Sequence, residues 1–195
     1  MLRQDLWPTP LWYFEVPQSL VNPGDIAQEA YTHQKMDPGL SISNVGGYQS
    51  SALTMNDRVH KNLSRLMEFI VGQCQVCAQE FGFTHQLALT NYWININKKY
   101  NYNKMHIHSP SRLSGSYYAV TPPDSGCIVL HNRPEASYIM GDLKQAGARD
   151  TVFTVTEQAF QPKAGAVVVF PGWLQHSVEE NKSDQDRISI AFNLV

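Results

Sequence analysis

The chain has 195 residues, of which 43% are hydrophobic and 16% are charged, as expected for a single well-cored domain. Its formal net charge is −2 at pH 7, and acidic and basic residues are interspersed, which argues against a nucleic-acid or membrane-surface partner. No stretch approaches the roughly 18 consecutive apolar residues of a membrane span. The first residues show no apolar run after a basic one, so we expect no signal peptide.

The beginning of the chain is expected to form one strand, one helix and a long loop. Residues 11–16 are rich in aromatic side chains and predict a strand. A helix is predicted from Ile26 to about Lys35, because a turn signal precedes it and Asp37-Pro-Gly39 follows it. Residues 40–56 are polar and predict a loop with one edge strand near Tyr48.

The clearest helix is predicted from about Asp57 to Phe81, where apolar residues recur at alternating spacings of three and four. Asn56 is the expected N-cap, and Gly82 is the expected stop. Cys74 and Cys77 fall inside the apolar stripe, so we expect them in the core rather than in a redox or zinc site. An odd total of three cysteines favours reduced thiols and a cytoplasmic location.

After Gly82 the apolar pattern changes to a period of two, which is typical of strands. We expect short strands at residues 89–97, 105–108, 113–120, 127–131, 151–155, 166–170, 175–178 and 187–194. Residues 133–149 are expected to be an insertion. The result is a mainly β, cupin-like jelly roll at residues 88–195, supported by an N-terminal strand and helices at residues 1–87, in one domain. Its edge strands and aromatic N-terminal segment are compatible with a homodimer.

Two histidines near the middle of the chain are spaced so that both could bind one metal ion. His106 and His108 lie two residues apart in an expected strand, so their side chains point to the same face. Two imidazoles on one face can bind a divalent transition metal, but they need a third ligand from elsewhere. His176 is the best candidate, and the three histidines therefore predict a metal site.

An anion-binding pair is predicted eleven residues after His176. Arg187 and Ser189 share a face of the last expected strand, and a guanidinium with a neighbouring hydroxyl can bind a carboxylate. A facial triad of protein ligands leaves positions on iron for a chelating co-substrate and oxygen. The co-substrate 2-oxoglutarate suits this order, because it chelates at one end and its far carboxylate needs a cation deeper in the barrel.

Together these motifs resemble a known enzyme family. The resemblance rests on His106-x-His108, Phe170-Pro-x-Trp-Leu-x-His176-x-Val178, Arg187-Ile-Ser-Ile-x-Phe-Asn193, Ser114-Gly-Ser-Tyr-Tyr118 and Pro123-Asp-Ser-Gly126. The chain resembles Fe(II)- and 2-oxoglutarate-dependent oxygenases, and more narrowly a branch related to prolyl hydroxylases that is found in bacteria and phages. The resemblance covers roughly residues 88–195.

The resemblance implies a double-stranded β-helix, an Fe(II) ion and 2-oxoglutarate as co-substrate. The metal ligands it implies are His106 and His176, with position 108 as the third. It also implies that Arg187 pairs with the far carboxylate of 2-oxoglutarate, assisted by Ser189 and by Tyr118. The implied reaction is hydroxylation of an unidentified substrate, for which a peptidyl or amino-acid side chain is the leading candidate.

One position departs from the family pattern. The usual first motif is His-x-Asp or His-x-Glu, whereas this chain has His108 at the second ligand position. Three neutral imidazoles can hold iron, but they equally describe a zinc site with one open position. Two rival functions therefore stay open: a cupin-like three-His metal enzyme that does not use 2-oxoglutarate, and a metal-binding module without catalysis. Asp124 and His131 are weaker candidates for a substitute ligand.

The substrate, a small molecule or a peptide, is expected to meet the protein at the rim of the barrel. Trp173 lies three residues before His176 and is a candidate contact. His131 ends an apolar run and is a second candidate. The loops at residues 40–56 and 133–149 are where we expect the substrate to be recognised.

Overall fold

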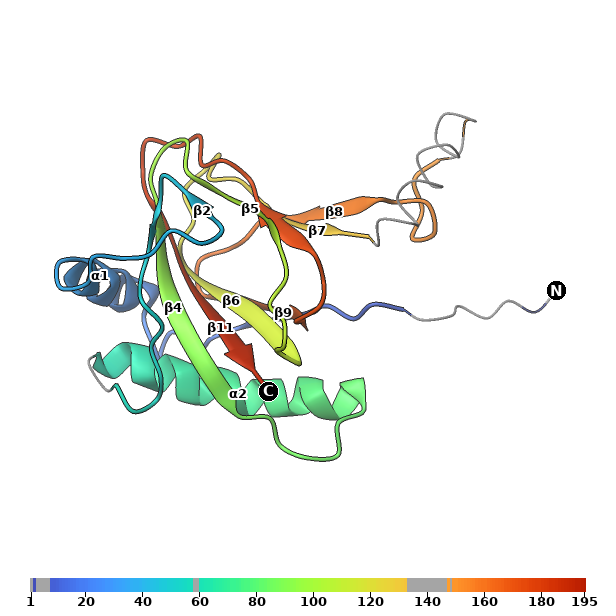
Figure 1. The fold of residues 1–195 in the computed structure, drawn as a ribbon, viewed down its shortest axis with the longest axis horizontal. Helices are drawn as coiled ribbons and strands as arrows, with labels where there is room; N and C mark the ends of the chain where they lie inside the picture. The colour runs from blue at the N-terminus through green and yellow to red at the C-terminus, as the bar shows by residue number, and fades with distance from the viewer. Residues whose placement is uncertain (1, 3–7, 58–59, 133–146, 148) are drawn as a thin grey trace.

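In the computed structural model, residues 2, 8–57, 60–132, 147 and 149–195 are described. The expected insertion at residues 133–149 therefore lies almost entirely outside the described residues. The rest of the chain folds into two antiparallel sheets that face each other, with two helices on one side (Figure 1). Neither helix of the described chain combines the length and the apolar character that crossing a bilayer would require.

The two sheets have the strand order of a jelly roll. The larger sheet contains, in order, β1 (Trp12–Glu15), β9 (Ala166–Pro171), β6 (Leu113–Val120), β11 (Arg187–Leu194), β4 (Leu89–Asn97) and β3 (Tyr48–Gln49). The smaller sheet contains β2 (Asn44–Val45), β5 (Tyr102–His106), β10 (His176–Val178), β7 (Ile128–His131) and β8 (Glu157–Phe160). From β4 onward, successive strands alternate between the sheets, except that β7 and β8 pair as neighbours. The predicted mainly β architecture is confirmed.

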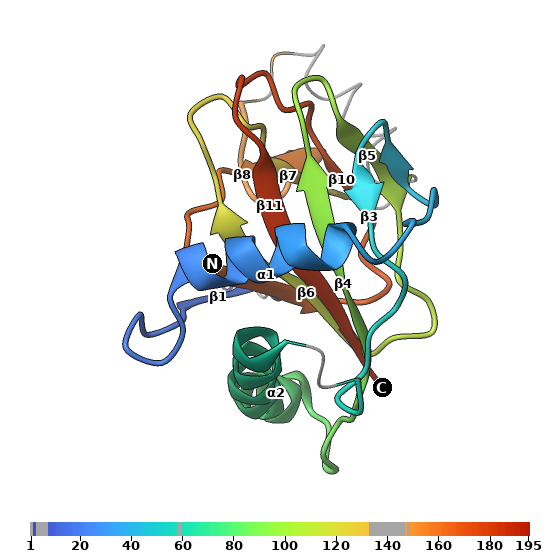
Figure 2. The ribbon, with the colours of Figure 1, turned by 90° about the vertical axis from the view of Figure 1, so that its left-hand side faces the viewer.

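The helices α1 (Pro23–Gln34) and α2 (Lys61–Phe81) lie over the outer face of the larger sheet (Figure 2). Asn22 accepts a hydrogen bond from the backbone N–H of Gly24 at the start of α1, at 2.8 Å. Gly82 ends α2 with φ of 101°, a left-handed conformation that glycine adopts without steric cost, so the predicted stop is confirmed. Cys74 and Cys77 are buried in the core, as expected.

The start of α2 differs from the prediction. The helix begins at Lys61 instead of Asp57, because the Asp57 carboxylate accepts hydrogen bonds from Thr54 and holds that segment in a turn. Asn56 is therefore not the N-cap. The free N–H groups at the helix start are instead bound by Glu29 of α1, whose carboxylate accepts from the backbone of Asn62 at 3.0 Å and of Leu63 at 2.8 Å.

Three expected strands also differ in detail. The segment 40–56 contains the two short strands β2 and β3 rather than one edge strand near Tyr48. Residues 151–155 form a turn in which Thr151 and Thr154 bond each other, and the strand follows as β8. The strand that carries the first histidine runs from Tyr102 to His106, so His108 lies in the loop that follows it.

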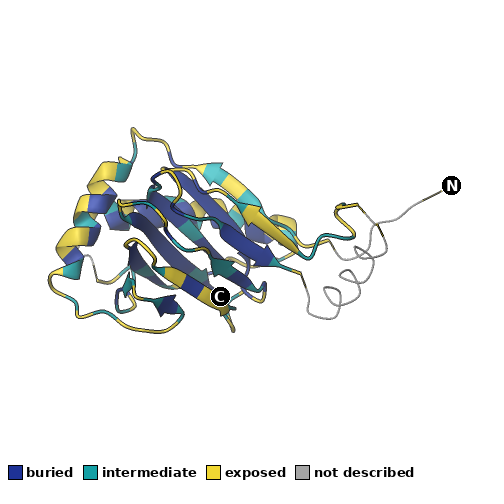
Figure 3. Ribbon diagram, turned by 90° about the horizontal axis from the view of Figure 1, so that it is seen from above, coloured by how far each residue is buried: buried dark blue, intermediate teal, exposed yellow. Residues whose placement is uncertain are grey.

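The larger sheet has an apolar outer face and a polar inner face. Its outward side chains form one apolar core with both helices, including Ile94, Ile188, Ile190 and Phe192. The alternate side chains of β4 and β11 point inward between the sheets, and among them are Asn95, Asn97, Arg187 and Ser189. The strands β6, β9 and β11 of the larger sheet are largely buried, whereas β5 and β8 of the smaller sheet are mostly exposed (Figure 3). This alternation directs the polar residues towards the smaller sheet.

Packing of α2 on the larger sheet predicts a stability difference between the two sides of this helix. Leu66 is fully buried, so Leu66→Ala should lower the free energy of unfolding by about 2–5 kcal/mol. Val76 lies on the same helix and is 52% exposed, so Val76→Ala should change it by less than about 0.5 kcal/mol. Urea denaturation followed by circular dichroism measures both values. Equal losses in the two variants would contradict this packing.

Candidate functional site

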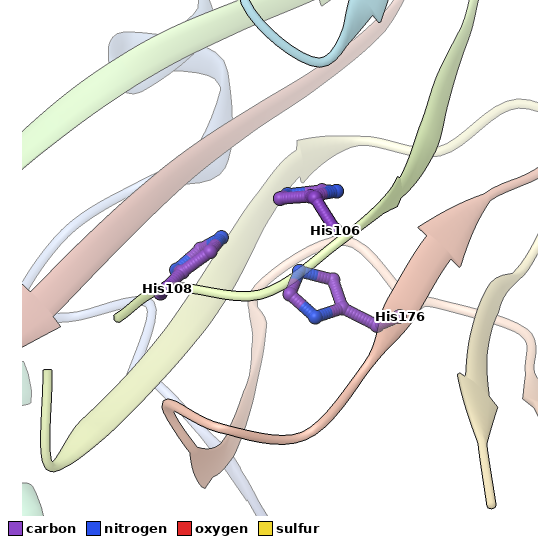
Figure 4. Close-up of side chains that lie close together, drawn as sticks. All are labelled: His106, His108 and His176. Atoms are coloured by element: carbon purple, nitrogen blue, oxygen red, sulfur yellow. The ribbon is translucent and has the colours of Figure 1, made fainter. Parts of the chain in front are cut away.

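Three histidines from two segments of the smaller sheet meet at one point between the sheets. His106 ends β5 and His176 begins β10, and the two residues are cross-strand partners. His108 follows β5 in a loop whose backbone N–H donates to the carbonyl of Gly172 at 2.8 Å. The ring centroids lie 4.3 to 5.1 Å apart, and one ligand atom of each ring lies within 4.8 Å of the others (Figure 4).

The hydrogen bonds of the rings fix which nitrogen is free. The Nδ1 atom of His106 lies 2.7 Å from the carbonyl oxygen of Lys104, and that of His176 lies 2.9 Å from the carbonyl oxygen of Leu174. A carbonyl oxygen only accepts, so both Nδ1 atoms donate a proton and both Nε2 atoms keep their lone pairs. The Nδ1 atom of His108 lies 2.8 Å from the amide oxygen of Asn193, and its Nε2 is buried without a partner.

Burial keeps the three rings neutral. It lowers the pKa of His106, it lowers the pKa of His108 to about 4, and it lowers the pKa of His176 to about 3. The neighbouring imidazoles add to the effect on His108 and His176, because two protonated rings would repel each other. Neutral imidazoles with free Nε2 atoms are the form that binds a transition metal.

The predicted anion-binding pair lines the same cavity as the histidines. Arg187 is 1% exposed, and its Nη1 donates to the carbonyl of Ser125 and, at 3.1 Å, to that of Glu179. Its Nη2 is buried and has no partner. Ser189 and Tyr118 also line this cavity. Burial raises the pKa of Tyr118 to about 12, so its hydroxyl stays protonated and able to donate.

The donor set fits the groups that the sequence predicts. Three neutral imidazole nitrogens suit a first-row divalent metal, and the unpartnered guanidinium nitrogen of Arg187 suits a carboxylate. The cavity is also lined by two asparagine side chains to which the sequence analysis gave no role. Asn95 and Asn97 line it, and each has a buried amide atom without a partner. Their signal was the alternation along β4, which placed polar residues on one face of a strand that otherwise packs in the core.

The remaining candidates lie outside the histidine group. Trp173 is 43% exposed in the turn between β9 and β10, next to Gly172, the residue that bonds the loop of His108. The Nε2 atom of His131 lies 2.9 Å from the hydroxyl of Ser177, and its Nδ1 lies 3.5 Å from a carboxylate oxygen of Glu157. His131 does not line the cavity, and neither His131 nor Asp124 belongs to the metal-binding group.

Several solved structures share the fold of this chain at low sequence identity. A prolyl-4-hydroxylase from Pseudomonas putida is 13% identical, with a TM-score of 0.67, over 95% of this chain and 92% of that one. A prolyl hydroxylase from Trichoplax adhaerens, in complex with a hypoxia inducible factor peptide fragment, is 11% identical, with a TM-score of 0.66, over 94% and 82%. HygX from Streptomyces hygroscopicus, with nickel and 2-oxoglutarate bound, is 10% identical, with a TM-score of 0.60, over 95% and 82%. These likenesses confirm the double-stranded β-helix fold.

Sequence comparison supplies the family. No curated protein sequence matches the chain. A family model described as "Putative 2OG-Fe(II) oxygenase" matches residues 91–193, which is more than half of the chain and includes the three histidines and Arg187. The chain therefore belongs to the family of Fe(II)- and 2-oxoglutarate-dependent oxygenases.

Proposed function

We propose that this oxygenase holds Fe(II) through His106, His108 and His176 and hydroxylates a peptidyl or amino-acid side chain. The observation that carries the ligand assignment is the commitment of all three Nδ1 atoms to oxygen partners. Each ring is left with a free Nε2, and one ligand atom of each ring lies within 4.8 Å of the other two. The unpartnered, buried Nε2 of His108 supports the same assignment, because a buried polar atom without a partner costs free energy unless a ligand satisfies it.

Arg187 is the proposed partner of the far carboxylate of 2-oxoglutarate. Two backbone carbonyls hold Nη1, which fixes the guanidinium plane and leaves Nη2 for an incoming anion. The burial of Arg187 makes an unsatisfied charge costly, so a carboxylate partner would be favoured here. Ser189 and Tyr118 line the same cavity and are the proposed additional donors.

When bound, Fe(II) and 2-oxoglutarate supply the oxidising chemistry, and the protein supplies position and shelter. Phe170 packs against His176 with ring centroids 4.6 Å apart, and Trp93 packs against His108 at 5.4 Å. These apolar contacts hold two of the three rings in place and exclude water from them.

The proposed substrate class rests on the neighbouring folds and on one exposed side chain. Two of the similar structures are prolyl hydroxylases, and one of them was solved with a peptide fragment. Trp173 offers apolar surface beside the loop of His108 and is the proposed substrate contact. The predicted roles of His131 and of the loop at residues 40–56 stay predictions, as do the cytoplasmic location and the homodimer.

The role of Arg187 can be tested by binding. Anaerobic titration of the Fe(II)-loaded protein with 2-oxoglutarate should produce the weak visible charge-transfer band that bidentate chelation gives. Arg187→Ala removes the cation that faces the far carboxylate, so the same band should need at least about tenfold more 2-oxoglutarate. Arg112→Ala is the matched control, because Arg112 is exposed in the bend before β6 and does not line the cavity, and its titration should match the wild type.

Two results would contradict this function. A wild-type protein that binds iron but shows no band would exclude 2-oxoglutarate chelation and favour a three-His metal enzyme of another kind. A band without succinate formation under oxygen would instead favour a module that binds both groups and does not turn over.

The histidines also predict how the stability of the metal-free protein depends on pH. The folded-state pKa of His176 is about 3, whereas a histidine in the unfolded chain titrates near 6.5. Between these values the unfolded chain binds more protons, so the free energy of unfolding should decrease as the pH is lowered from 7 to 5. His176→Gln should reduce this decrease by about 2 kcal/mol.

Urea denaturation in the presence of a chelator, at pH 7 and at pH 5, measures the effect. His85→Gln replaces an exposed histidine and should keep the pH dependence of the wild type. A His176→Gln variant whose stability falls with pH as steeply as the wild type would show that His176 does not stay neutral in the folded protein.

A further inference from the structure

His108 differs from the other two site histidines in how its ring is held. His106 and His176 each donate Nδ1–H to a backbone carbonyl two residues earlier on their own segment. His108 lies beyond the end of β5, and its Nδ1 reaches across to a side chain of the larger sheet, Asn193 on β11. The orientation of this one ring therefore depends on side chains from the opposite sheet.

Asn193 is itself fixed by its two neighbouring strands. Its amide oxygen accepts from the hydroxyl of Ser114 on β6 at 2.7 Å, and its amide nitrogen donates to the side-chain oxygen of Asn91 on β4 at 3.0 Å. Asn193 is the cross-strand partner of both residues, so the three side chains share the inner face of the sheet. With its nitrogen committed to Asn91, the amide turns its oxygen towards His108.

We propose that Asn193, held by Asn91 and Ser114, is the positioning residue that makes His108 a metal ligand. By accepting Nδ1–H, the Asn193 oxygen selects the tautomer in which the Nε2 lone pair of His108 faces the other two rings. This inference rests on the proposed ligand set, and it explains how an imidazole serves at position 108. A carboxylate at that position would offer two equivalent oxygens on a short side chain. An imidazole binds the metal through Nε2 only, so its other nitrogen, Nδ1, needs a hydrogen-bond partner that fixes the ring.

Metal binding should depend on whether residue 193 offers an acceptor and on the charge of that acceptor. Asn193→Leu keeps the branched shape of the side chain but removes the acceptor, so the His108 ring loses its tautomer and its orientation. Asn193→Asp keeps an acceptor oxygen and makes it anionic, which raises the basicity of the imidazole it binds. The first change should weaken metal binding, and the second should leave it at least as strong as in the wild type.

The test is a double-mutant cycle on metal affinity, with Co(II) as the probe and competition against a chromogenic chelator as the measurement. Asn193→Leu should lower the affinity about 10- to 100-fold. In a His108→Ala background, Asn193→Leu should cause no further loss, because the ring on which it acts is absent. Ser114→Ala, a smaller change, should give a weaker loss that also vanishes in the His108→Ala background. If Asn193→Leu does not fold, Ser114→Ala is the variant that tests the proposal.

A spectroscopic readout separates positioning from a general structural effect. The paramagnetically shifted NMR spectrum of the Co(II) protein in water should contain three exchangeable imidazole N–H signals. Asn193→Leu should remove one of them and keep the two whose protons are donated to the backbone carbonyls of Lys104 and Leu174. Asn193→Asp should retain all three.

The outcomes that overturn the proposal differ from those that overturn the proposed ligand set. If His108→Ala binds Co(II) like the wild type, His108 is not a ligand, and both proposals fail. If His108→Ala weakens binding but Asn193→Leu does not, only the role of Asn193 fails. If Asn193→Leu weakens binding equally with and without His108, its effect is structural, and the role of Asn193 again fails.

Discussion

The antiparallel pairing of β10 with β5 is the contact on which the site depends. It places His176 directly opposite His106, although the four strands β6 to β9 lie between them in the sequence. Cross-strand partners have Cβ atoms only about 5 Å apart, so the two imidazoles meet without any movement of a loop. A shift of the pairing by one residue would turn Ser177 towards the cavity and His176 away from it. The short strand β10 is held in its register from the other side by β7.

Much of this arrangement is encoded in local patterns. The alternation along β4 and β11 predicted both strands with the observed bounds, and the apolar stripe of α2 predicted its buried face. The three histidines and Arg187 were predicted from residue type and spacing, and the structure brings all four to one cavity. These features depend on side-chain period and on strand order, which a single sequence displays.

The parts that could not be predicted depend on contacts between distant segments. Glu29 of α1 caps the start of α2, and nothing in the sequence of α2 itself indicates that a carboxylate from another helix binds there. The sequence predicted that His106 and His108 lie close together because both belong to one strand. The structure brings the two side chains together, but only His106 belongs to the strand. His108 lies past the strand end, and it is directed by Asn193 from the opposite sheet.

β11 lies in the middle of the larger sheet, between β6 and β4, yet it follows both of these strands in the sequence. On the ribosome, β4 and β6 emerge well before the residues that will separate them, and each then exposes an unpaired edge. The nascent chain cannot close this sheet, or place Arg187 in the cavity and Asn193 beside His108, until translation has passed β11. Folding and assembly of the site therefore wait for the synthesis of β11, and a chain interrupted before β11 would present two complementary strand edges to other molecules.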